Sequence, residues 1–261
     1  MSGLPLGGRR AVVTGGGRGI GAATARALAE AGAAVIIAAR TEVEVEETAA
    51  SLSGEGLDVR GASCDVTDPH SVDRLTATAN QRLGGVDILV NGAGVAFSAP
   101  LAKTTLADWE RIFAVNVTGT FLCTQSFFPA MIERGWGRVV SVASVAGLAG
   151  AKYISAYASS KHAVLGFTRS LAEEAAAGGV TVNAVCPGYV DTPMTAASIA
   201  RIAERTGRSE GEARAAILAT SPQGRLIEPS EVARAIVWLC EEAARGVNGQ
   251  AIVIDGGALR A

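Results

Sequence analysis

The stretch Thr14-Gly-Gly-Gly-Arg-Gly-Ile-Gly21 follows the apolar run Ala11–Val13 and leads into the alanine-rich segment Ala22–Ala31. A strand that enters a glycine-rich turn and then a helix is the first unit of a dinucleotide-binding fold. The glycines allow a tight turn, a close approach of the backbone and tight helix packing, and the free N–H groups at the start of the helix attract a pyrophosphate. We therefore predict a nucleotide site formed by Gly15, Arg18, Gly19, Ile20 and Gly21.

The same alternation of apolar runs and helical segments continues along the chain. Further strands are predicted at Ala34–Ala38, Val59–Cys64, Ile88–Asn91, Val139–Val142, Val180–Val185 and Ile252–Ile254. These runs do not alternate with polar residues, as expected for strands that are buried on both faces. Helical periods are found at Val43–Ser51, Ser71–Leu83, Ala158–Ala176 and Pro229–Cys240. The pattern predicts an α/β fold: a doubly wound, Rossmann-type parallel sheet of seven strands with helices on both faces, in a single domain over residues 1–261.

Composition narrows the class of protein. The 261 residues are 49% hydrophobic and 18% charged, which is typical of a globular chain, and the formal net charge of −2 offers no basic field for nucleic acid. No apolar stretch is long enough to cross a membrane, so we expect a cytoplasmic protein that binds neither membrane nor nucleic acid. Cysteine and histidine are sparse and not at ligand spacing, which predicts buried free thiols in a reducing compartment and no metal site; these residues are Cys64, Cys123, Cys186, Cys240, His70 and His162.

Two segments depart from the regular pattern. The acidic run Glu42–Glu47 is interpreted as a solvated helix face. Residues 192–224 are polar and helical in propensity, and no strand follows them until Ile252. Because ligands of such sheets bind beyond the carboxyl ends of the strands, we expect this insertion to form a substrate lid over the crevice.

The glycine turn has the spacing G-x-x-x-G-x-G, and several short motifs follow it in a characteristic order. They are Cys64-Asp65-Val66, Asn91-Gly92-Ala93-Gly94, Asn116, Ser144, Tyr157, Lys161, Pro187-Gly188 and Asp255-Gly256-Gly257. In this order and over essentially its whole length, the chain resembles the short-chain dehydrogenase/reductase family. The resemblance implies an oxidoreductase that transfers a hydride between a nicotinamide dinucleotide and a ketone or secondary alcohol.

Three of these residues suit proton transfer to a carbonyl oxygen. Tyr157 and Lys161 are four residues apart, so they share one face of a helix, and a nearby cation lowers the pKa of a phenol from its usual value of about 10. Ser144 follows a predicted strand, where a hydroxyl faces the ligand crevice and can donate to a developing oxyanion. Taken one at a time, the Tyr–Lys pair could be a surface pair and Ser144 a cap.

The resemblance assigns a role to each of four residues. Tyr157 is the general acid in reduction and the base in oxidation, while Lys161 lowers the pKa of Tyr157 and binds the nicotinamide ribose. Ser144 polarises the carbonyl. Asn116, which alone would be interpreted as a turn or cap residue, helps to hold a water chain that leads to the lysine.

The end of the second strand indicates which nicotinamide is used. NAD-binding chains place an acid there on the ribose hydroxyls, but this chain has Ala39 followed by Arg40. A guanidinium can bind a 2′-phosphate, and Arg18 could add a second cation. We predict that NADP(H) is preferred, and NAD(H) is the alternative if Arg40 is an ordinary exposed arginine.

The resemblance implies further cofactor contacts. Asp65 and Val66 would flank the adenine, and Asn91, Ala93 and Gly94 would lie beside the nicotinamide ribose. The carboxamide would be held by Pro187, Gly188, Val190 and Thr192. The family usually has two consecutive asparagines where this chain has Asn91-Gly92, so we expect a looser backbone there. Tyr153, four residues before Tyr157, is interpreted as a wall of the substrate pocket.

Substrate and partners stay open at this point. The Asn183–Met194 segment resembles members that reduce 3-oxoacyl thioesters or polyketides on coenzyme A or acyl carrier protein, and also NAD-dependent dehydrogenases of small hydroxy acids or ring alcohols. A non-catalytic NADP(H)-sensing regulator is the alternative of another class. Basic lid residues could meet a phosphopantetheine or an acidic carrier, or could be a solvated face balanced by Glu204, Glu210 and Glu212; they are Arg201, Arg205, Arg208 and Arg214. The resemblance also implies a homotetramer, packed through helices around Asn116–Met131 and Tyr157–Ala176.

Overall fold

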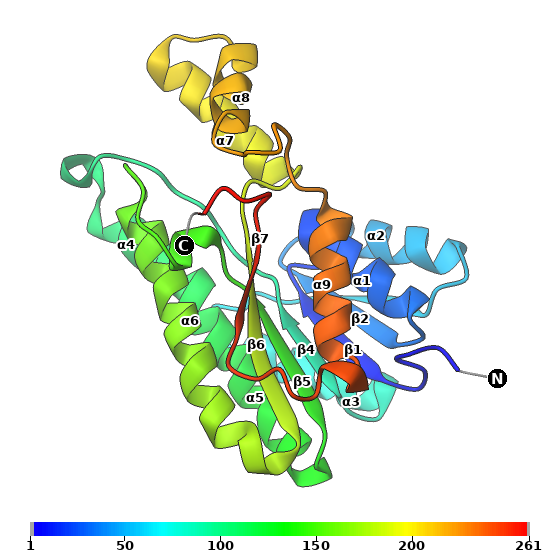
Figure 1. The fold of residues 1–261 in the computed structure, drawn as a ribbon. Coiled ribbons are helices and arrows are strands. Elements are labelled where there is room, and N and C mark those ends of the chain that lie inside the picture. The colour runs from blue at the N-terminus through cyan, green and yellow to red at the C-terminus, as the bar shows by residue number, and fades with distance from the viewer. Residues whose placement is uncertain (1–2, 260–261) are drawn as a thin grey trace.

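A computed structural model describes residues 3–259 and contains one seven-stranded parallel sheet (Figure 1). Its strands are β1 (Arg10–Thr14), β2 (Ala34–Ala39), β3 (Val59–Ser63), β4 (Ile88–Asn91), β5 (Gly137–Val142), β6 (Val180–Pro187) and β7 (Ala251–Ile254). The spatial order is β3-β2-β1-β4-β5-β6-β7, so the chain reverses its direction of winding between β1 and β4. The predicted doubly wound fold is confirmed, and every predicted strand end lies within two residues of the observed one.

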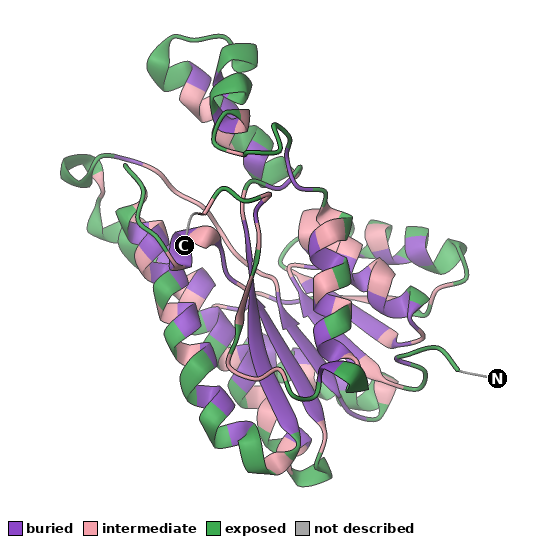
Figure 2. Ribbon diagram, in the orientation of Figure 1, coloured by how far each residue is buried: buried purple, intermediate pink, exposed green. Residues whose placement is uncertain are grey.

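The strands form because their side chains are buried on both faces. Figure 2 shows the centre of the sheet as an almost continuous buried layer, and the β1 residues Ala11, Val12 and Val13 are fully buried. Neighbouring Val and Ile residues pack alternately into the apolar clusters above and below the sheet. Burial of both faces explains the continuous, non-alternating apolar runs in the sequence.

Helices cover both faces of the sheet (Figure 1). One face carries α1 (Gly19–Glu30), α2 (Glu42–Gly54) and α9 (Pro229–Cys240), whose buried residues share one apolar cluster. The other face carries α3 (Pro69–Leu83), α5 (Gly119–Arg134) and α6 (Ser155–Ala175). The described residues also contain four short 3₁₀ turns: Leu101–Lys103, Val145–Gly147, Ala176–Gly178 and Glu242–Ala244.

Two helices begin three residues earlier than their apolar periods suggest. The first turn of α1 is Gly19, Ile20 and Gly21 themselves, although glycine is a poor helix former, because tight packing outweighs propensity there. The α6 helix begins at Ser155 instead of Ala158. Tyr157 therefore lies in the first turn of α6 and Lys161 in the second.

A helix that we did not predict, α4 (Leu106–Phe113), precedes α5. It begins at a reciprocal capping box, in which the Thr105 hydroxyl accepts the Asp108 N–H at 3.1 Å and the Asp108 carboxylate accepts the Thr105 N–H at 3.2 Å. Between α4 and α5 lies a π-helical turn, Ala114–Thr118, which contains Asn116. Such turns are single insertions into a helix and are frequent at functional sites.

The segment predicted as a lid is helical and projects beyond the carboxyl ends of the strands (Figure 1). It consists of α7 (Pro193–Thr206) and α8 (Glu210–Leu218), which pack on each other around their own small apolar cluster. Its base is joined where the Asp191 N–H donates to the Ile227 carbonyl (2.8 Å) and the Ile227 N–H donates to the Tyr189 carbonyl (2.9 Å). These two bonds fix the entry and exit of the lid beside each other.

The four cysteines are buried free thiols, as predicted. Within residues 3–259, no helix is both long enough and apolar enough to cross a bilayer. The same residues contain no group of three or more His, Cys, Asp or Glu side chains placed to hold a metal ion.

Candidate active site

A cleft of about 570 Å³ opens at the carboxyl ends of the strands, where the winding reverses between β1 and β4. Most of the residues predicted for the site line it. They are Gly15, Arg18, Gly19, Ile20, Gly21, Arg40, Asp65, Val66, Ala93, Gly94, Ser144, Tyr157, Lys161, Pro187, Gly188, Val190 and Thr192. Asn91 and Asn116 lie behind its wall and do not line it.

The glycine turn is held together by backbone contacts that leave no room for side chains. A methyl group added at Gly21 would lie 2.0 Å from the Gly15 carbonyl oxygen, and one added at Gly15 would lie 2.7 Å from the Gly92 carbonyl. Gly15 and Gly19 also have positive φ angles, 67° and 55°. No side chain of the described chain caps α1, so its first N–H groups stay available to an anion. This cradle fits a pyrophosphate.

The opposite wall closes over the turn from β6 and the start of the lid. The Thr192 side chain lies against Gly19, 3.2 Å from the position that a Cβ would occupy there. The Thr192 hydroxyl accepts the Thr195 N–H at 3.4 Å and so caps α7. The cleft is thus narrow at the turn, between two segments that are far apart in the sequence.

One end of the cleft carries exposed charges. Arg18 and Arg40 are exposed there, beside Asp65 and Val66. Hydrogen bonds from the Thr67 N–H (2.9 Å) and hydroxyl (2.8 Å) lower the pKa of Asp65, and the Arg40 guanidinium adds a smaller lowering. Asp65 is therefore a carboxylate whose orientation is fixed by Thr67.

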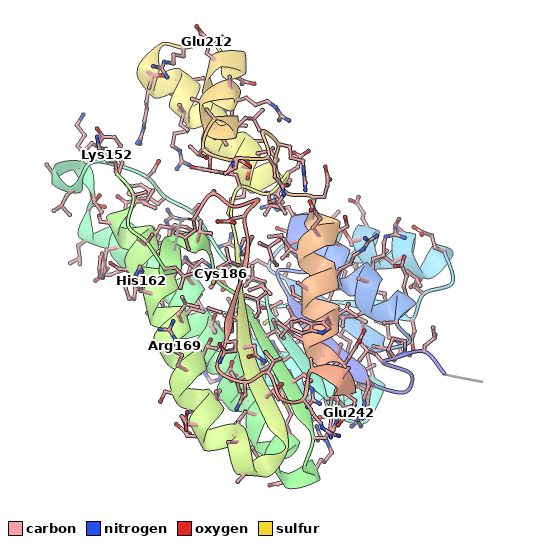
Figure 3. The ribbon with its side chains drawn as sticks, viewed as in Figure 1. Lys152, His162, Arg169, Cys186, Glu212 and Glu242 are labelled. Carbon is pink, nitrogen blue, oxygen red and sulfur yellow. The ribbon has the colours of Figure 1, made fainter. Side chains whose placement is uncertain are left out.

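The other end of the cleft brings Ser144, Tyr157 and Lys161 together. Ser144 follows β5 in an extended conformation, and its hydroxyl accepts the Ala146 N–H at 3.1 Å. Lys161 is only 5% exposed, and its Nζ donates to the Val142 carbonyl at the end of β5 (2.8 Å). The same Nζ lies 5.8 Å from the centre of the Tyr157 ring. In Figure 3, Cys186 is labelled near the carboxyl end of β6, the strand next to β5.

Burial controls the protonation of this pair. It lowers the pKa of Lys161 to about 8, and it raises the pKa of Tyr157 above its usual value, against a smaller opposite effect of the hydrogen bond with Ser144. The sequence predicted that Lys161 would lower the pKa of Tyr157. In the structure the pKa of Tyr157 is raised instead, and the group that opposes this rise is Ser144 and not Lys161. The loss of solvation has the largest effect on both Tyr157 and Lys161, because a buried phenolate and a buried ammonium are each costly.

Asn116 holds the wall of the cleft from behind. Its amide Oδ1 accepts the Val95 N–H (2.9 Å), and its Nδ2 donates to the Val95 carbonyl (3.1 Å) and to the Ser160 hydroxyl (3.0 Å). Ser160 in turn donates to the Tyr157 carbonyl at 2.7 Å. Asn116, which is 1% exposed, thus joins the loop after β4 to the helix that carries Tyr157.

The loop after β4 is not loose, contrary to the expectation from Asn91-Gly92. The Thr14 hydroxyl accepts the N–H groups of Gly92 (3.2 Å) and Ala93 (3.3 Å), and a methyl group at Gly92 would lie 2.6 Å from the Thr14 carbonyl oxygen. Asn91 donates through Nδ2 to the Thr124 hydroxyl (2.9 Å) and keeps a buried Oδ1 without a partner. Sequence reasoning missed Thr14, although its position directly before the glycine turn was a usable signal.

Tyr153 does not form a pocket wall, which corrects the prediction. Its side chain is 62% exposed, and it lies outside the residues that line the cleft. Its φ is 70°, a left-handed conformation that is uncommon for tyrosine, and its carbonyl accepts the Ala99 N–H at 2.8 Å. This backbone contact joins the Tyr153 segment to the loop at Ala99.

Several lining residues were not predicted for the cleft. They include Arg111 and Val115, which come from α4 and the π turn. The lid, residues 192–224, was predicted to cover the crevice, and its first residues do line the cleft: Met194, Thr195, Ala197 and Arg201. Glu44, from the acidic run interpreted as a solvated face, also lines the cleft. Among the other lid arginines, Arg205 donates to the Ser98 carbonyl at 2.5 Å. Glu212 lies at the far tip of the lid, away from the cleft (Figure 3).

The comparison with protein families agrees with this arrangement. Residues 9–202 match the model of the short chain dehydrogenases. The chain belongs to that family. It is accordingly an NAD(P)-dependent oxidoreductase that acts on CH–OH groups and the corresponding ketones, as predicted.

Similar proteins cover nearly the whole chain. It is 39% identical to a candidate ketoacyl reductase of Streptomyces coelicolor (95% of each chain) and 36% identical to the D-β-hydroxybutyrate dehydrogenase of Cupriavidus necator (97% of this chain, 98% of the other). Among solved structures, a variant of the actinorhodin polyketide ketoreductase determined with NADPH is 38% identical, with a TM-score of 0.93 over 96% of this chain and 97% of the other. The chain is thus similar over nearly its whole length to two ketoreductases and to a hydroxybutyrate dehydrogenase.

Proposed function

We propose that the protein is an NADP(H)-dependent ketoreductase whose substrate is the ketone of a 3-oxoacyl thioester or polyketide. The observation that carries this proposal is one continuous cleft that has the glycine turn and Arg40 at one end and Ser144, Tyr157 and Lys161 at the other. The bound nicotinamide would supply the hydride in reduction and accept it in oxidation. The protein has to bind the carbonyl, move one proton and keep out water.

In reduction, the proton on the substrate oxygen comes from Tyr157. Burial keeps the phenol protonated at neutral pH, so the acid form is the one present before the reaction. As the carbonyl oxygen gains charge, Tyr157 gives up its proton and becomes a phenolate; oxidation reverses this transfer. The Ser144 oxygen accepts the Ala146 N–H, so its hydroxyl proton can turn from Tyr157 to the substrate oxygen when substrate binds.

Lys161 supports the same step in two ways. Its ammonium lies one helical turn from Tyr157 and stabilises the phenolate as it forms. One of its three N–H donors is used on the Val142 carbonyl, and the remaining donors can hold the nicotinamide ribose. Asn116 acts here as a positioning residue through Ser160 and Val95, and the water chain to the lysine would run beside it.

The preference for NADP(H) rests on charge at the end of β2. The chain has no acid there to bind the ribose hydroxyls, whereas Arg40 and Arg18 both line the cleft and are exposed. Two guanidinium groups suit a dianionic 2′-phosphate through paired, charge-assisted hydrogen bonds. The solved ketoreductase with NADPH supports the same cofactor.

The substrate class rests on the start of the lid. Met194 and Ala197 supply apolar surface to the cleft, and Arg201 adds a partly buried cation that a phosphopantetheine arm could approach. The relatives include a 3-oxoacyl-(acyl-carrier-protein) reductase of Aquifex aeolicus, 35% identical over 97% of this chain. We infer that the lid (residues 192–224) covers an acyl group carried on coenzyme A or a carrier protein.

The outer aromatic residues suggest how copies of the chain associate. Phe121 on α5 is 42% exposed and meets Phe167 on α6 edge to face, with ring centres 6.3 Å apart. On α4, which precedes α5 in the sequence, Trp109 stacks on Phe113 and is also partly exposed. Exposed aromatic surface of this kind supports the packing of copies through α5 and α6, and we propose a homotetramer. The four buried free thiols suit the reducing cytoplasm, where we propose that the protein is found.

Replacement of Tyr157 by Phe tests the proposed chemistry. The variant loses the transferable proton and keeps the ring, so NADPH oxidation with 3-oxoacyl thioesters should fall by roughly 10³-fold or more, while NADPH binding stays within about threefold. Ring ketones and small oxo acids should be assayed as substrates beside the 3-oxoacyl thioesters. The matched control variant is Tyr153→Phe, which should keep wild-type turnover. A wild-type protein that binds NADPH but turns over none of these compounds would instead be a cofactor-sensing regulator.

The lowered pKa of Lys161 predicts a pH dependence. Its ammonium is present below about pH 8 and is lost above it, so kcat/KM for ketone reduction should decrease as the pH rises through about 8. In Lys161→Arg the guanidinium stays charged, and this decrease should disappear even if the overall rate is lower. Steady-state rates measured between pH 6 and 10 give the pH dependence of kcat/KM for the wild type and for Lys161→Arg. An unchanged decrease near pH 8 in the variant would assign it to another group.

Reversal of the charge at Arg40 tests the cofactor. Arg40→Asp should shift the ratio of kcat/KM for NADPH over NADH towards NADH by roughly 100-fold, because a carboxylate repels the 2′-phosphate and accepts ribose hydroxyls. Arg74→Asp, the same charge change on the exposed face of α3, is the control and should leave the ratio unchanged. If both variants keep the wild-type ratio of kcat/KM for NADPH over NADH, Arg40 does not bind the 2′-phosphate.

A further inference from the structure

Glu44 occupies an unexpected place at the charged end of the cleft. Its side chain comes from the first turn of α2 and is only 29% exposed, although its neighbours Glu42, Glu46 and Glu47 are exposed. Its carboxylate lies over Gly17, 2.7 Å from where a Cβ of that glycine would be. It also lies 3.6 Å from the Nε of Arg18. An acid therefore packs directly on the glycine turn.

The helix that carries Glu44 is fixed against the same turn. The Thr48 hydroxyl, one turn further along α2, donates to the Gly17 carbonyl at 2.6 Å. Thr48 and Glu44 thus bracket Gly17, which is itself buried. The position of the carboxylate is set by this packing rather than by a freely moving surface chain.

The local sequence would have allowed a different role for Glu44. Thr41-Glu42-Val43-Glu44 has the T-x-x-E pattern of a capping box, in which the acid turns back onto the backbone at the start of its own helix. In this protein α4 and α8 form such boxes, with Thr105 and Asp108 and with Ser209 and Glu212. In α2 the Thr41 side chain makes no cap hydrogen bond, and Glu44 faces Arg18 instead.

This placement has an electrostatic consequence. The proposed 2′-phosphate would be bound by Arg40 and Arg18, and Glu44 lines the same part of the cleft as both. Its negative charge repels a second anion, and its ion pair with Arg18 withholds one of the two cations. The repulsion and the loss of Arg18 do not weaken the binding of NAD(H), whose adenosine ribose carries only hydroxyl groups.

We propose that Glu44 is a selectivity residue that weakens NADP(H) relative to NAD(H) by competing with the 2′-phosphate for Arg18. The inference rests on the proposed use of NADP(H) and extends it. Arg40 favours the phosphate and Glu44 opposes it, so the preference of the wild-type enzyme is moderate and NAD(H) stays usable. The ligand group recognised is a ribose 2′-phosphate.

The test is to measure by calorimetry the dissociation constants of NADPH, NADH and adenosine 2′-monophosphate for the Glu44→Gln variant and the wild type. Glutamine keeps the packing on Gly17 and removes only the charge. We expect the Kd of NADPH and of the monophosphate to fall by about fivefold, mainly because Arg18 is released to pair with the 2′-phosphate, and the Kd of NADH to stay within about twofold. Glu42→Gln is the matched control, because it removes the same charge from the same helical turn outside the cleft, and it should change none of the three.

The role of Arg18 is tested in the double variant. In an Arg18→Ala background, Glu44→Gln should improve NADPH binding by no more than about twofold, since there is no cation left to release. Equal effects of Glu44→Gln and Glu42→Gln, or an unchanged Kd for NADPH in Glu44→Gln, would overturn the proposal. These outcomes are independent of turnover: if the wild type binds NADH alone and Glu44→Gln gains NADPH binding, Glu44 is a selectivity residue and the NADP(H) preference is wrong.

Discussion

The hydrogen bond from Lys161 Nζ to the Val142 carbonyl joins the end of β5 to the second turn of α6. It fixes the amine inside the protein, with 5% exposure, and sets α6 so that Tyr157, one turn earlier, faces the same cleft. Asn116 and Ser160 hold α6 from the other side, through bonds to Val95 and to the Tyr157 carbonyl. The geometry of the proposed proton transfer depends on these hydrogen bonds, which hold α6 against β5 and the loop after β4.

The two ends of the cleft use charge in opposite ways. At the glycine turn, Arg18, Arg40, Glu44 and Asp65 are at least partly exposed, so their charges persist and sort anions by attraction and repulsion. At the other end, burial disfavours charge: it raises the pKa of Tyr157 and lowers that of Lys161 to about 8. One end can therefore select a cofactor while the other moves a proton, because the degree of solvation differs along a single cleft.

Much of the architecture could be predicted from the sequence, for identifiable reasons. Strands buried on both faces, such as Ala34–Ala39, leave continuous apolar runs, and the glycines of the turn mark where backbone meets backbone. The start of α1 at Gly19 was missed because packing, which propensity does not report, decides it. Glu44 was missed for a similar reason: its local pattern describes a solvated or capping acid, and its contact with Arg18 and Gly17 is made across the fold.

Other features depend on contacts that no local pattern encodes. Tyr153 has a positive φ, its carbonyl accepts the Ala99 N–H, and its side chain is exposed outside the pocket that its spacing suggested. Asn116 lies in a π turn, where its amide reaches Val95 and Ser160 at once. The pKa of Tyr157 depends on how far solvent is excluded, which the spacing of Tyr and Lys does not reveal.

The proposed proton transfer requires that burial keep the Tyr157 phenol protonated before the cofactor and substrate arrive. The chain has three tyrosines, so an ultraviolet titration of tyrosinate in the wild type minus that in Tyr157→Phe isolates this one group. Because burial raises the pKa of Tyr157, we expect the difference signal only above about pH 10, the usual pKa of a free phenol. A Tyr157 phenolate that forms near neutral pH in the free protein would contradict it.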